Sequence, residues 1–253
     1  MIYVTGDCHG DWTRFQPNCF PEQKEMTRDD YLIVCGDFGI WHDNNGKEKK
    51  KLDAIARLPY TILFVDGNHE NFNRLNTEFE EVDFCGGKAH KIRENLYHLE
   101  RGYVFTLQDK KFFCFGGASS HDIGDGILIP SDFTNKREFE KVYNKMWEQG
   151  KMFRVKDVSW WEEELPSDEE YVRGIFSLKD YNQNVDYIIS HCCPQSIADV
   201  IGRGFYNGDS LTEYFDEIAK ATTFSKWLFG HYHIDSNIYG KYVALYYQII
   251  RIV

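Results

Sequence analysis

Short apolar runs that each stop at a glycine or a polar cluster are the feature of this sequence that most restricts its fold. They are rich in β-branched and aromatic residues, and all but the last are four or five residues long. The runs are residues 2–5, 31–35, 61–65, 103–107, 111–115, 187–190, 226–229 and 242–253. Runs of this length suit strands that are buried on both faces or that lie at the centre of a sandwich. The chain is therefore expected to build sheets that are covered on both sides.

Helical patterns separate several of these runs. Residues 47–58 are predicted to form a helix that ends before a proline, and their basic cluster is most simply a solvated helix face. Ser167 with Glu170, and Ser210 with Glu213, have the spacing of a capping box at a helix start. The expected apolar faces comprise Leu52, Ile55, Ala56 and Leu58 in the first helix, Tyr171, Ile175 and Phe176 in the second, and Phe215 and Ile218 in the third.

The order of strands and helices indicates the fold class. Strands and helices alternate early in the chain, whereas strands follow one another at 103–115 and near the C-terminus. This mixture predicts an α/β fold, namely a four-layer α/β/β/α sandwich of two mixed β-sheets flanked by helices. We expect a single domain over residues 1–253, in which residues 121–182 form a helical insertion over one end of the core.

Composition narrows the classes of protein. Hydrophobic residues make up 42% of the chain, enough for a sizeable core, and 29 Lys and Arg against 40 Asp and Glu leave a formal charge of −11. Affinity for many nucleic-acid phosphates needs a basic stripe, so nucleic acid is not favoured as a partner. No run of about 18 apolar residues is present and the start lacks a charged leader, so we expect a cytoplasmic protein with no membrane partner. Seven cysteines without a CxxC pair predict reduced, buried thiols.

Residues that can bind metals stand where five of the apolar runs end. Ligands gather outside the carboxyl ends of strands in open α/β sheets, so these side chains are expected to meet at one edge. Residues i and i+2 of an extended segment point the same way, which lets His231 and His233 act together. Nitrogen and oxygen donors without thiolate suit Mn, Fe, Zn or Co, and seven donors suit two metals better than one tetrahedral ion. The donors are Asp7, His9, Asp37, Asn68, His191, His231 and His233.

Five motifs carry a family resemblance. GDCHG, GDFG, GNHE, SH and GHYH occur in this order between residues 6 and 233. Together they resemble the five motif blocks of the calcineurin-like metallophosphoesterase superfamily. The resemblance implies a phosphoesterase that cleaves a phosphate mono- or diester with a metal-bound hydroxide, and it implies two divalent metal ions as cofactors. Mn is the metal we favour, with Fe, Zn, Ni and Co as alternatives.

The resemblance also implies a role for each motif residue. One metal would be held by Asp7, His9 and His233, the other by Asn68, His191 and His231, and Asp37 would bridge them. His69 would not be a ligand. It would lie beside the scissile phosphate as a general acid or a stabilising cation, and the alternative is that it orients a metal ligand.

Closer similarity is to small bacterial and phage members of the superfamily. The second motif continues as Phe-Gly-Ile-Trp at 38–41 and not as Val-Asp-Arg-Gly, which argues against a protein Ser/Thr phosphatase. The features similar to the small members are Asn-Phe at 71–72, GGASSHD at 116–122 and Trp-Trp-x-x-Glu at 160–164. Compared with these members, the chain carries a longer insertion at about 123–153. This insertion would alter the lid over the site, so the identity of the substrate stays open.

Candidate substrate contacts are less specific. His121 and Asp122 follow a strand in a glycine-rich loop, and a plain loop role is equally open. A guanidinium matches phosphate bidentately, so an arginine could clamp the substrate, although surface arginines are common. The arginines considered are Arg74, Arg154 and Arg203, and no role is assigned to His42, His90 or His98.

Three rival functions remain open. A nuclease would use the same metals but need a basic approach, so a strongly negative rim would count against it. A non-catalytic interaction module that retained the fold would lack some of the ligands, and none is missing here. A structural zinc protein would hold one closed ion and unfold on chelation. The expected partner is a small-molecule phosphoester, and its identity, the mono- or diester preference and the oligomeric state stay open.

Overall fold

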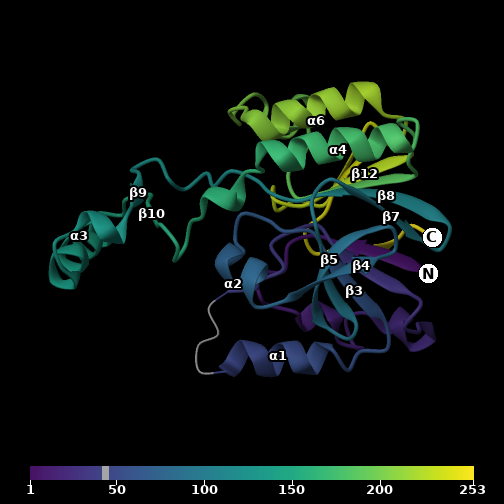
Figure 1. Ribbon diagram of the computed structural model, residues 1–253, viewed down its shortest axis with the longest axis horizontal. Helices are drawn as coiled ribbons and strands as arrows, with labels where there is room; N and C mark the ends of the chain where they lie inside the picture. Colours follow the sequence, from purple (N-terminus) through teal and green to yellow (C-terminus); the bar gives the residue numbers. More distant parts are fainter. Residues whose placement is uncertain (42–45) are drawn as a thin grey trace.

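Two mixed β-sheets pack face to face, and helices cover the outer face of each (Figure 1). The computed structural model describes residues 1–41 and 46–253. The two termini lie side by side at one end of the sandwich, where the backbone of Ile2 bonds to that of Val253. The predicted four-layer α/β/β/α arrangement is confirmed.

The first sheet is seven-stranded, in the order β15-β1-β2-β3-β6-β5-β4. Its parallel centre consists of β1 (Ile2–Thr5), β2 (Tyr31–Val34), β3 (Thr61–Phe64) and β6 (Leu96–Leu99). Antiparallel strands flank this centre, with β15 (Ile249–Arg251) on one side and β5 (Gly87–Arg93) and β4 (Glu80–Phe84) on the other. The parallel centre aligns the carboxyl ends of β1, β2 and β3.

The second sheet is six-stranded, in the order β13-β14-β12-β11-β8-β7. Its parallel centre consists of β8 (Lys110–Phe115), β11 (Tyr187–Ser190), β12 (Lys226–Phe229) and β14 (Tyr242–Ala244). The antiparallel edges are β7 (Tyr103–Leu107) and β13 (Ser236–Ile238). β11 and β12 lie next to each other, so the segments that follow them emerge together.

The central strands of each sheet are buried on both faces. On β2, Ile33 points into the core between the sheets, whereas Leu32 and Val34 belong to the cluster on the opposite face, because successive residues of a strand face opposite sides. On β8, Phe112 belongs to the central core and Phe113 to the cluster beneath the outer helices. This double burial explains why the strands appear as continuous apolar runs.

The strand predictions fail in two respects. Residues 242–253 do not form one strand, because the chain crosses from β14 in the second sheet to β15 in the first. In addition, several strands were not predicted, namely β4, β5, β6, β13 and the two short strands at 127–128 and 154–155. The hairpin of β4 and β5 is rich in charged residues, and its exposed face carries no apolar run that could signal a strand.

Three helices show how well the sequence placed helix faces. In α1 (Lys47–Ile55) the expected Leu52 and Ile55 are buried. The capping box of Ser167 with Glu170 opens α4 (Asp168–Asp180), as predicted. The predicted face of α4 is confirmed at Tyr171, which packs against the core, but it is wrong at Ile175 and Phe176, which are 48% and 58% exposed, while Leu178 is buried. In α6 (Ser210–Ala221) the predicted Phe215 and Ile218 are buried, but Asp209 caps the helix in place of Ser210.

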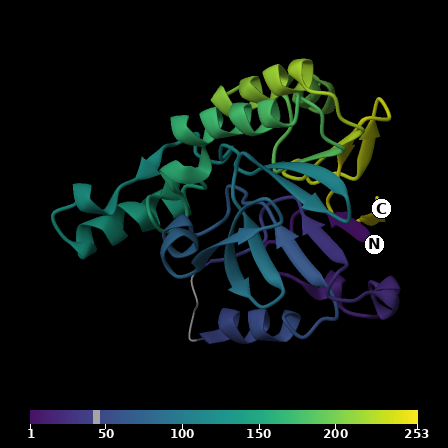
Figure 2. The same cartoon turned by 45° about the vertical axis from the view of Figure 1, so that its right-hand side comes forward.

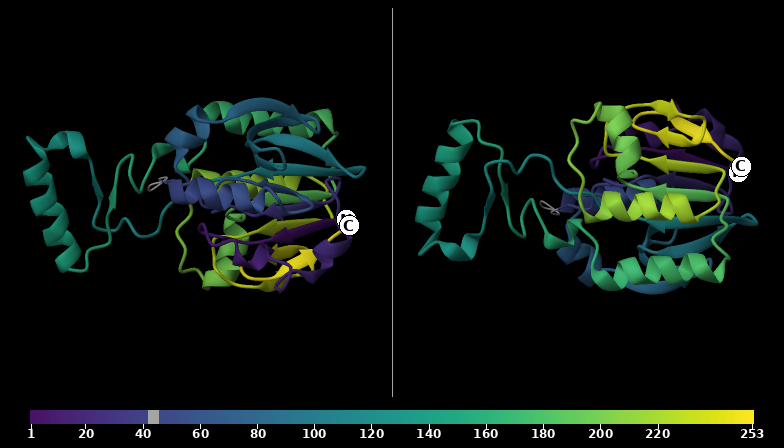
Figure 3. Two further views of the ribbon diagram at one scale, coloured as in Figure 1. Left: turned by 90° about the horizontal axis from the view of Figure 1, so that it is seen from below. Right: turned by 90° about the horizontal axis from the view of Figure 1, so that it is seen from above.

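An arm projects from the end of the sandwich opposite the termini, as Figures 2 and 3 show from three sides. Two short paired strands, β9 (Ile127–Leu128) and β10 (Arg154–Val155), lead out to α3 (Lys136–Glu148) and back. No residue of α3 is buried. The chain then returns through a single turn, η5 (Glu162–Glu164), to α4 on the outer face of the second sheet.

Shorter helices complete the covering layers. They are η1 (Thr13–Phe15), η2 (Pro21–Glu25), α2 (Phe72–Thr77), η4 (Pro130–Asp132) and α5 (Gln195–Gly202). Five cysteines are buried, whereas Cys85 is half-buried and Cys19 is exposed. Within the described part of the chain, every helix is too short or too polar to cross a bilayer.

Candidate metal centre

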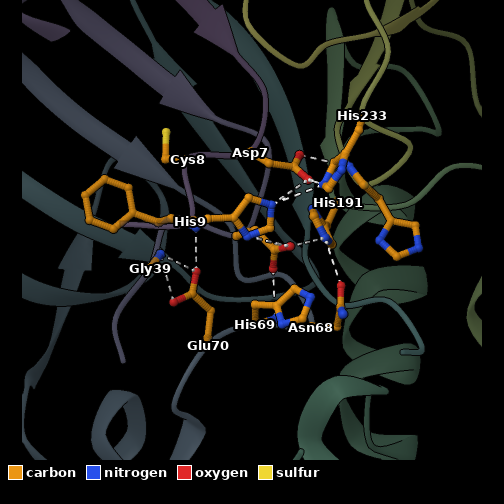
Figure 4. A network of polar contacts seen from close by, with 12 residues as sticks. Asp7, Cys8, His9, Gly39, Asn68, His69, Glu70, His191 and His233 are labelled. Carbon is orange, nitrogen blue, oxygen red and sulfur yellow. Dashed lines mark hydrogen bonds and ion pairs between the residues drawn. The ribbon is translucent and has the colours of Figure 1, made fainter. Parts of the chain in front are cut away.

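The ends of five strands bring the predicted donors together at one edge of the sandwich. In the first sheet, Asp7, Asp37 and Asn68 follow β1, β2 and β3. In the second sheet, His191 and His231 follow β11 and β12. Figure 4 shows side chains from both sheets pointing into one shared space. The two sheets therefore supply one site, as the order of the motifs predicted.

The first donor group consists of Asp7, His9 and His233, whose donor atoms all lie within 4.8 Å of one another. His233 Nε2 lies 3.1 Å from both His9 Nε2 and Asp7 Oδ2. Asp7 Oδ2 is buried and accepts no hydrogen bond, whereas Oδ1 accepts one from the backbone N–H of His231 at 2.9 Å. A buried carboxylate oxygen without a hydrogen bond, facing two imidazoles, fits a divalent cation.

The second donor group lies around His191, which is fully buried. Its Nε2 is 3.4 Å from Asp37 Oδ2 and 3.2 Å from Asn68 Oδ1. Its Nδ1 donates to the carbonyl of Cys35 at 2.8 Å, which fixes the ring with Nε2 toward the site. Asp37 Oδ2 is also 3.7 Å from His9. One oxygen of Asp37 therefore faces ligands of both groups, as a bridging carboxylate would.

His231 is the predicted ligand that lies least close to the others. Its ring stands 5.0 Å from that of His191 between centroids, but its Nε2 lies 2.7 Å from Nε2 of His121. Two imidazole nitrogens at this distance share one proton, with one ring as donor and the other as acceptor. His121, predicted from the sequence only as a candidate substrate contact, thus contacts one of the predicted metal ligands.

Four of the predicted ligands have a left-handed backbone conformation. The φ angles are 49° at His9, 46° at Asp37, 66° at His231 and 51° at His233. This conformation is uncommon outside glycine and costs about 1 kcal/mol or more per residue. Backbone strain of this kind accumulates at functional sites, because it aims side chains that regular structure would send elsewhere.

Glycines in the motifs allow the ligands to pack against neighbouring strand ends. A Cβ atom on Gly36 would lie 2.1 Å from Nδ1 of His191, and one on Gly67 would lie 2.1 Å from Oδ1 of Asp37. A Cβ on Gly230 would lie 2.1 Å from Oδ1 of Asp7. Each glycine therefore leaves space for a ligand contributed by a different motif.

Charge coupling inside the site is strong. Burial favours the neutral form of the His191 imidazole. The neighbouring Asp37 carboxylate outweighs this effect of burial and raises the pKa of His191 to about 10. Burial likewise opposes the charged form of Asp37, yet His191, His69 and His9 lower the pKa of Asp37. Without a metal, the two residues form an imidazolium–carboxylate pair at neutral pH. A metal ion at His191 must therefore displace a proton.

His69 lies beside the donors and contacts the arm. Its backbone N–H donates to Asp37 Oδ1 at 2.8 Å, while its ring faces the Arg154 guanidinium with Nδ1–Nη1 and Nε2–Nη2 distances of 3.3 and 3.4 Å. Arg154 is held by Asp122, through Nε at 2.8 Å. Burial lowers the pKa of His69, and Arg154 lowers it further against the opposing effect of Asp37. The arm thus delivers Arg154 to the centre.

A cavity of about 460 Å³ opens beside His69 and His9. Trp41 and Trp161 form part of its wall, and Arg154 supplies its charge. The indole N–H of Trp41 donates to the carbonyl of His69 at 2.5 Å, which fixes the ring at the rim. The volume suits a small ester or one nucleotide.

Two buried glutamates support the ligands and were not assigned a role from the sequence. Glu70 accepts hydrogen bonds from three consecutive backbone N–H groups, those of Phe38, Gly39 and Ile40, and so shapes the loop after Asp37. Glu164 accepts from the backbone N–H of Ser120 at 3.2 Å, and Ser120 Oγ accepts from Nδ2 of Asn68 at 3.2 Å. These two hydrogen bonds, from Ser120 to Glu164 and from Asn68 to Ser120, leave Oδ1 of Asn68 directed at His191.

A buried ion pair lies beneath the third motif. Asp66 accepts from Arg101 Nε at 2.9 Å and lies 3.1 Å from His98 Nε2. Burial opposes ionisation, but Arg101 and His98 lower the pKa of Asp66. His98, to which the sequence assigned no role, is thus part of the support under Asn68. His90 stacks on His98, and His42 lies outside the described residues.

Two arginines considered from the sequence lie away from the centre. Arg74 forms ion pairs with Glu48 and Glu78 at 2.7 and 2.9 Å, so its guanidinium is engaged within the protein. Arg203 is exposed at the C-terminal end of α5. Of the candidate clamps, Arg154 is the one that reaches the site.

Comparison with known proteins defines the family. A model of the calcineurin-like phosphoesterase family matches residues 1–235, and the chain belongs to this family. It is 26% identical over 212 residues to lariat debranching enzyme A of Xenopus laevis, a match that covers 78% of this chain and 33% of that protein. The chain therefore spans about a third of the length of this curated relative.

Solved structures resemble the chain at lower identity. Phosphopantetheinyl hydrolase from Mycobacterium tuberculosis matches with a TM-score of 0.45 and 15% identity, covering 97% of this chain and 89% of that one. A protein of unknown function from Aquifex aeolicus matches with a TM-score of 0.27 and 18% identity, covering 64% of this chain and 81% of that one.

Proposed function

We propose that this chain is a dinuclear-metal phosphoesterase that hydrolyses a phosphate mono- or diester. The observation that carries the proposal is the shared oxygen of Asp37, which lies 3.7 Å from His9 in one donor group and 3.4 Å from His191 in the other. A structural zinc site needs one closed set of four ligands. Two adjoining groups that share a carboxylate support two ions.

The ligands would divide as the motifs suggest. Asp7, His9 and His233 would hold one ion, and Asn68 with His191 would hold the other, with Asp37 between them. His231 would join the second ion if its imidazole turned from His121. When bound, divalent ions at such a site acidify a water molecule and stabilise charge on phosphoryl oxygens. Mn is the ion we favour, because the donor set is nitrogen and oxygen without thiolate.

Other side chains of the site would handle the substrate. Arg154 would pair with a phosphoryl oxygen, since its guanidinium faces the cavity and Asp122 fixes its orientation. His69 lies next to Arg154 and lines the same cavity. The negative charge of a substrate phosphate would oppose the effect of Arg154 on the pKa of His69 and favour the protonated form of His69. His69 could then donate a proton to the leaving oxygen.

A nuclease is the second candidate function. The curated relative is a lariat debranching enzyme, and the rim of this site is not uniformly negative, because Lys47, Lys51 and Arg154 face cavities beside His9. Asp11 and Glu48 line the rim as well, so the rim is mixed in charge and does not count against a nuclease as a strongly negative rim would. The presence of every predicted ligand does not favour a non-catalytic module.

The test uses protein stripped of metal and then reloaded. Chromogenic mono- and diesters are assayed with Mn, Zn, Ni and Mg, and elemental analysis gives the metal content of the same samples. We expect turnover only when about two ions are bound per chain. Asp37→Asn should abolish turnover and leave the fold intact. Normal activity in Asp37→Asn, or full activity with one ion, would contradict the dinuclear assignment.

A further inference from the structure

We propose that α1 provides a second anion-binding subsite at Lys47 and Lys51, so that the substrate is a short nucleotide chain carrying a second phosphate next to the scissile one. This inference rests on the proposed function, because it extends the same site. It also changes the interpretation of the basic cluster at 47–51, which the sequence alone presents as a solvated helix face.

The position of Lys51 is the first argument. Its Nζ donates to the carbonyl of Gly10 at 3.3 Å, and Gly10 directly follows the predicted ligand His9. Lys47 lies one helical turn before Lys51 on α1, so both side chains leave the helix on the same side. Both lysines line a cavity of about 360 Å³ that His9 also lines. An anion in this cavity would therefore adjoin the metal centre.

The local charge is the second argument. Residues 47–51 contain four lysines and one glutamate in a chain of net charge −11. That glutamate, Glu48, is paired with Arg74 at 2.7 Å. Asp11 also lines the cavity, and its carboxylate accepts hydrogen bonds from Thr13. Arg74 also pairs with Glu78, so it offsets Glu48 only in part. Both acidic residues of the cavity are nevertheless engaged within the protein, Glu48 by Arg74 and the backbone N–H of Trp41 and Asp11 by Thr13. Lys47 and Lys51 therefore bring two ammonium groups to this cavity beside the site.

Trp41 indicates what joins the two phosphates. Trp41 lines both the cavity with the lysines and the cavity with Arg154, so it adjoins both of them. Trp41 is 43% exposed, and its indole N–H is fixed on the carbonyl of His69. An exposed aromatic ring between two anion-binding regions suits a nucleobase, which stacks on aromatic side chains irrespective of sequence. A substrate with one phosphate and no base would leave Trp41 and the lysines unused.

The test compares two substrates that differ by one phosphate. The metal-loaded protein hydrolyses thymidine dinucleotide, with one phosphodiester, and thymidine trinucleotide, with two. Lys51→Gln should raise KM for the trinucleotide by about 2- to 5-fold, the range for exposed ion pairs. The double variant Lys47→Gln with Lys51→Gln should raise it by about 5- to 20-fold. KM for the dinucleotide and kcat for both substrates should change less than about 2-fold.

A matched control and a salt series sharpen the comparison. Lys50→Gln removes an exposed lysine of the same helix that does not line the described cavities, and it should leave both KM values unchanged. In the double variant, losing the contact to the one additional phosphate should flatten the dependence of log KM on log salt for the trinucleotide by about 0.7. An unchanged ratio of the two KM values in the double variant would overturn the subsite, and so would an equal effect of Lys50→Gln.

Binding measurements separate this inference from the proposed function. Isothermal titration calorimetry of both oligonucleotides with the Asp37→Asn variant needs no turnover. Tighter binding of the trinucleotide that is lost with Lys47→Gln and Lys51→Gln supports the subsite even if no ester is hydrolysed, in which case the proposed function fails alone. Equal affinity for both oligonucleotides overturns the subsite. Inorganic tripolyphosphate that competes as well as the trinucleotide would overturn the assignment to nucleotides.

Discussion

Gly67 is the position where adding one methyl group should weaken metal binding without unfolding the protein. Its φ lies outside the left-handed region, so an alanine can adopt the backbone conformation without strain. A Cβ atom there would nevertheless lie 2.1 Å from Oδ1 and 2.5 Å from the backbone nitrogen of Asp37, whereas ordinary contact begins at 3.4 Å. The difference of 3.4 − 2.1 = 1.3 Å means that Asp37 must move.

The size of the effect follows from this overlap. The nearest atoms include the main chain of Asp37, which no side-chain rotation can relieve. Inserting a methyl group into a packed region typically costs about 1–3 kcal/mol. If that free energy is lost from metal binding, Gly67→Ala weakens the affinity by about 5- to 150-fold. Turnover should fall with metal content, while the core between the sheets, which lies away from the strand ends, should keep the fold.

The assay measures metal content, turnover and thermal unfolding with and without Mn²⁺. Gly124→Ala is the matched control, because nothing lies within 4 Å of its Cβ position and its φ is also outside the left-handed region. We expect Gly124→Ala to bind metal like the parent protein, and Gly67→Ala to lose most of the increase in Tm that Mn²⁺ produces. Full metal content and parental turnover in Gly67→Ala would refute the packing argument.

Three further predictions concern the catalytic role of His69, proton release from His191 and the buried ion pair of Asp66 with Arg101. His69→Ala should lower kcat by about 100-fold or more with two metals still bound. Loss of metal from this variant, measured by elemental analysis, would instead identify His69 as a metal ligand. Because the pKa of His191 is raised to about 10, metal binding at pH 7 should release a proton, and the stability that the pair with Asp37 gives the metal-free protein should fade as pH rises toward 10. Calorimetric titration of metal in buffers of different ionisation enthalpy measures that proton release. The absence of proton release would contradict the pairing of His191 with Asp37. Arg101→Met should destabilise the protein by about 3–5 kcal/mol, since it leaves Asp66 buried without its main partner, and chemical denaturation showing less than 1 kcal/mol would exclude a buried ion pair.

The positions of the donors could be predicted from the sequence because each follows a strand that is buried on both faces. An apolar run that stops at glycine marks the strand end, and residues such as Asp7 and Asp37 stand directly after it. The parallel order then brings these ends to one edge. This reasoning needs local sequence only, so it reached the fold class and the residues that the structure brings together at the strand ends, whose role as metal ligands stays a prediction.

The support behind the donors could not be predicted, because it depends on pairs that are distant in sequence. Glu164 meets Ser120 across 44 residues, and Glu70 meets the loop after Asp37 across about 30. Neither contact has a local pattern. The face of α4 failed for a related reason: its exposed Phe176 is as apolar as its buried Leu178, and only the second sheet decides which one is covered.

The strain in the site follows from a preformed geometry. Four ligands hold left-handed backbone, Asp7 Oδ2 is buried without a hydrogen bond, and the motif glycines let the ligands pack closely. The strained backbone and the unsatisfied carboxylate oxygen disfavour the metal-free fold. If cations bind as we propose, ion–ligand attraction would replace the missing hydrogen bond and fix the strained residues. A ligand that binds only the native state adds to stability in proportion to the logarithm of its concentration over Kd. On this proposal the two sheets must be stable enough to hold the strand ends in place without metal, and the burial of their central strands on both faces supports this.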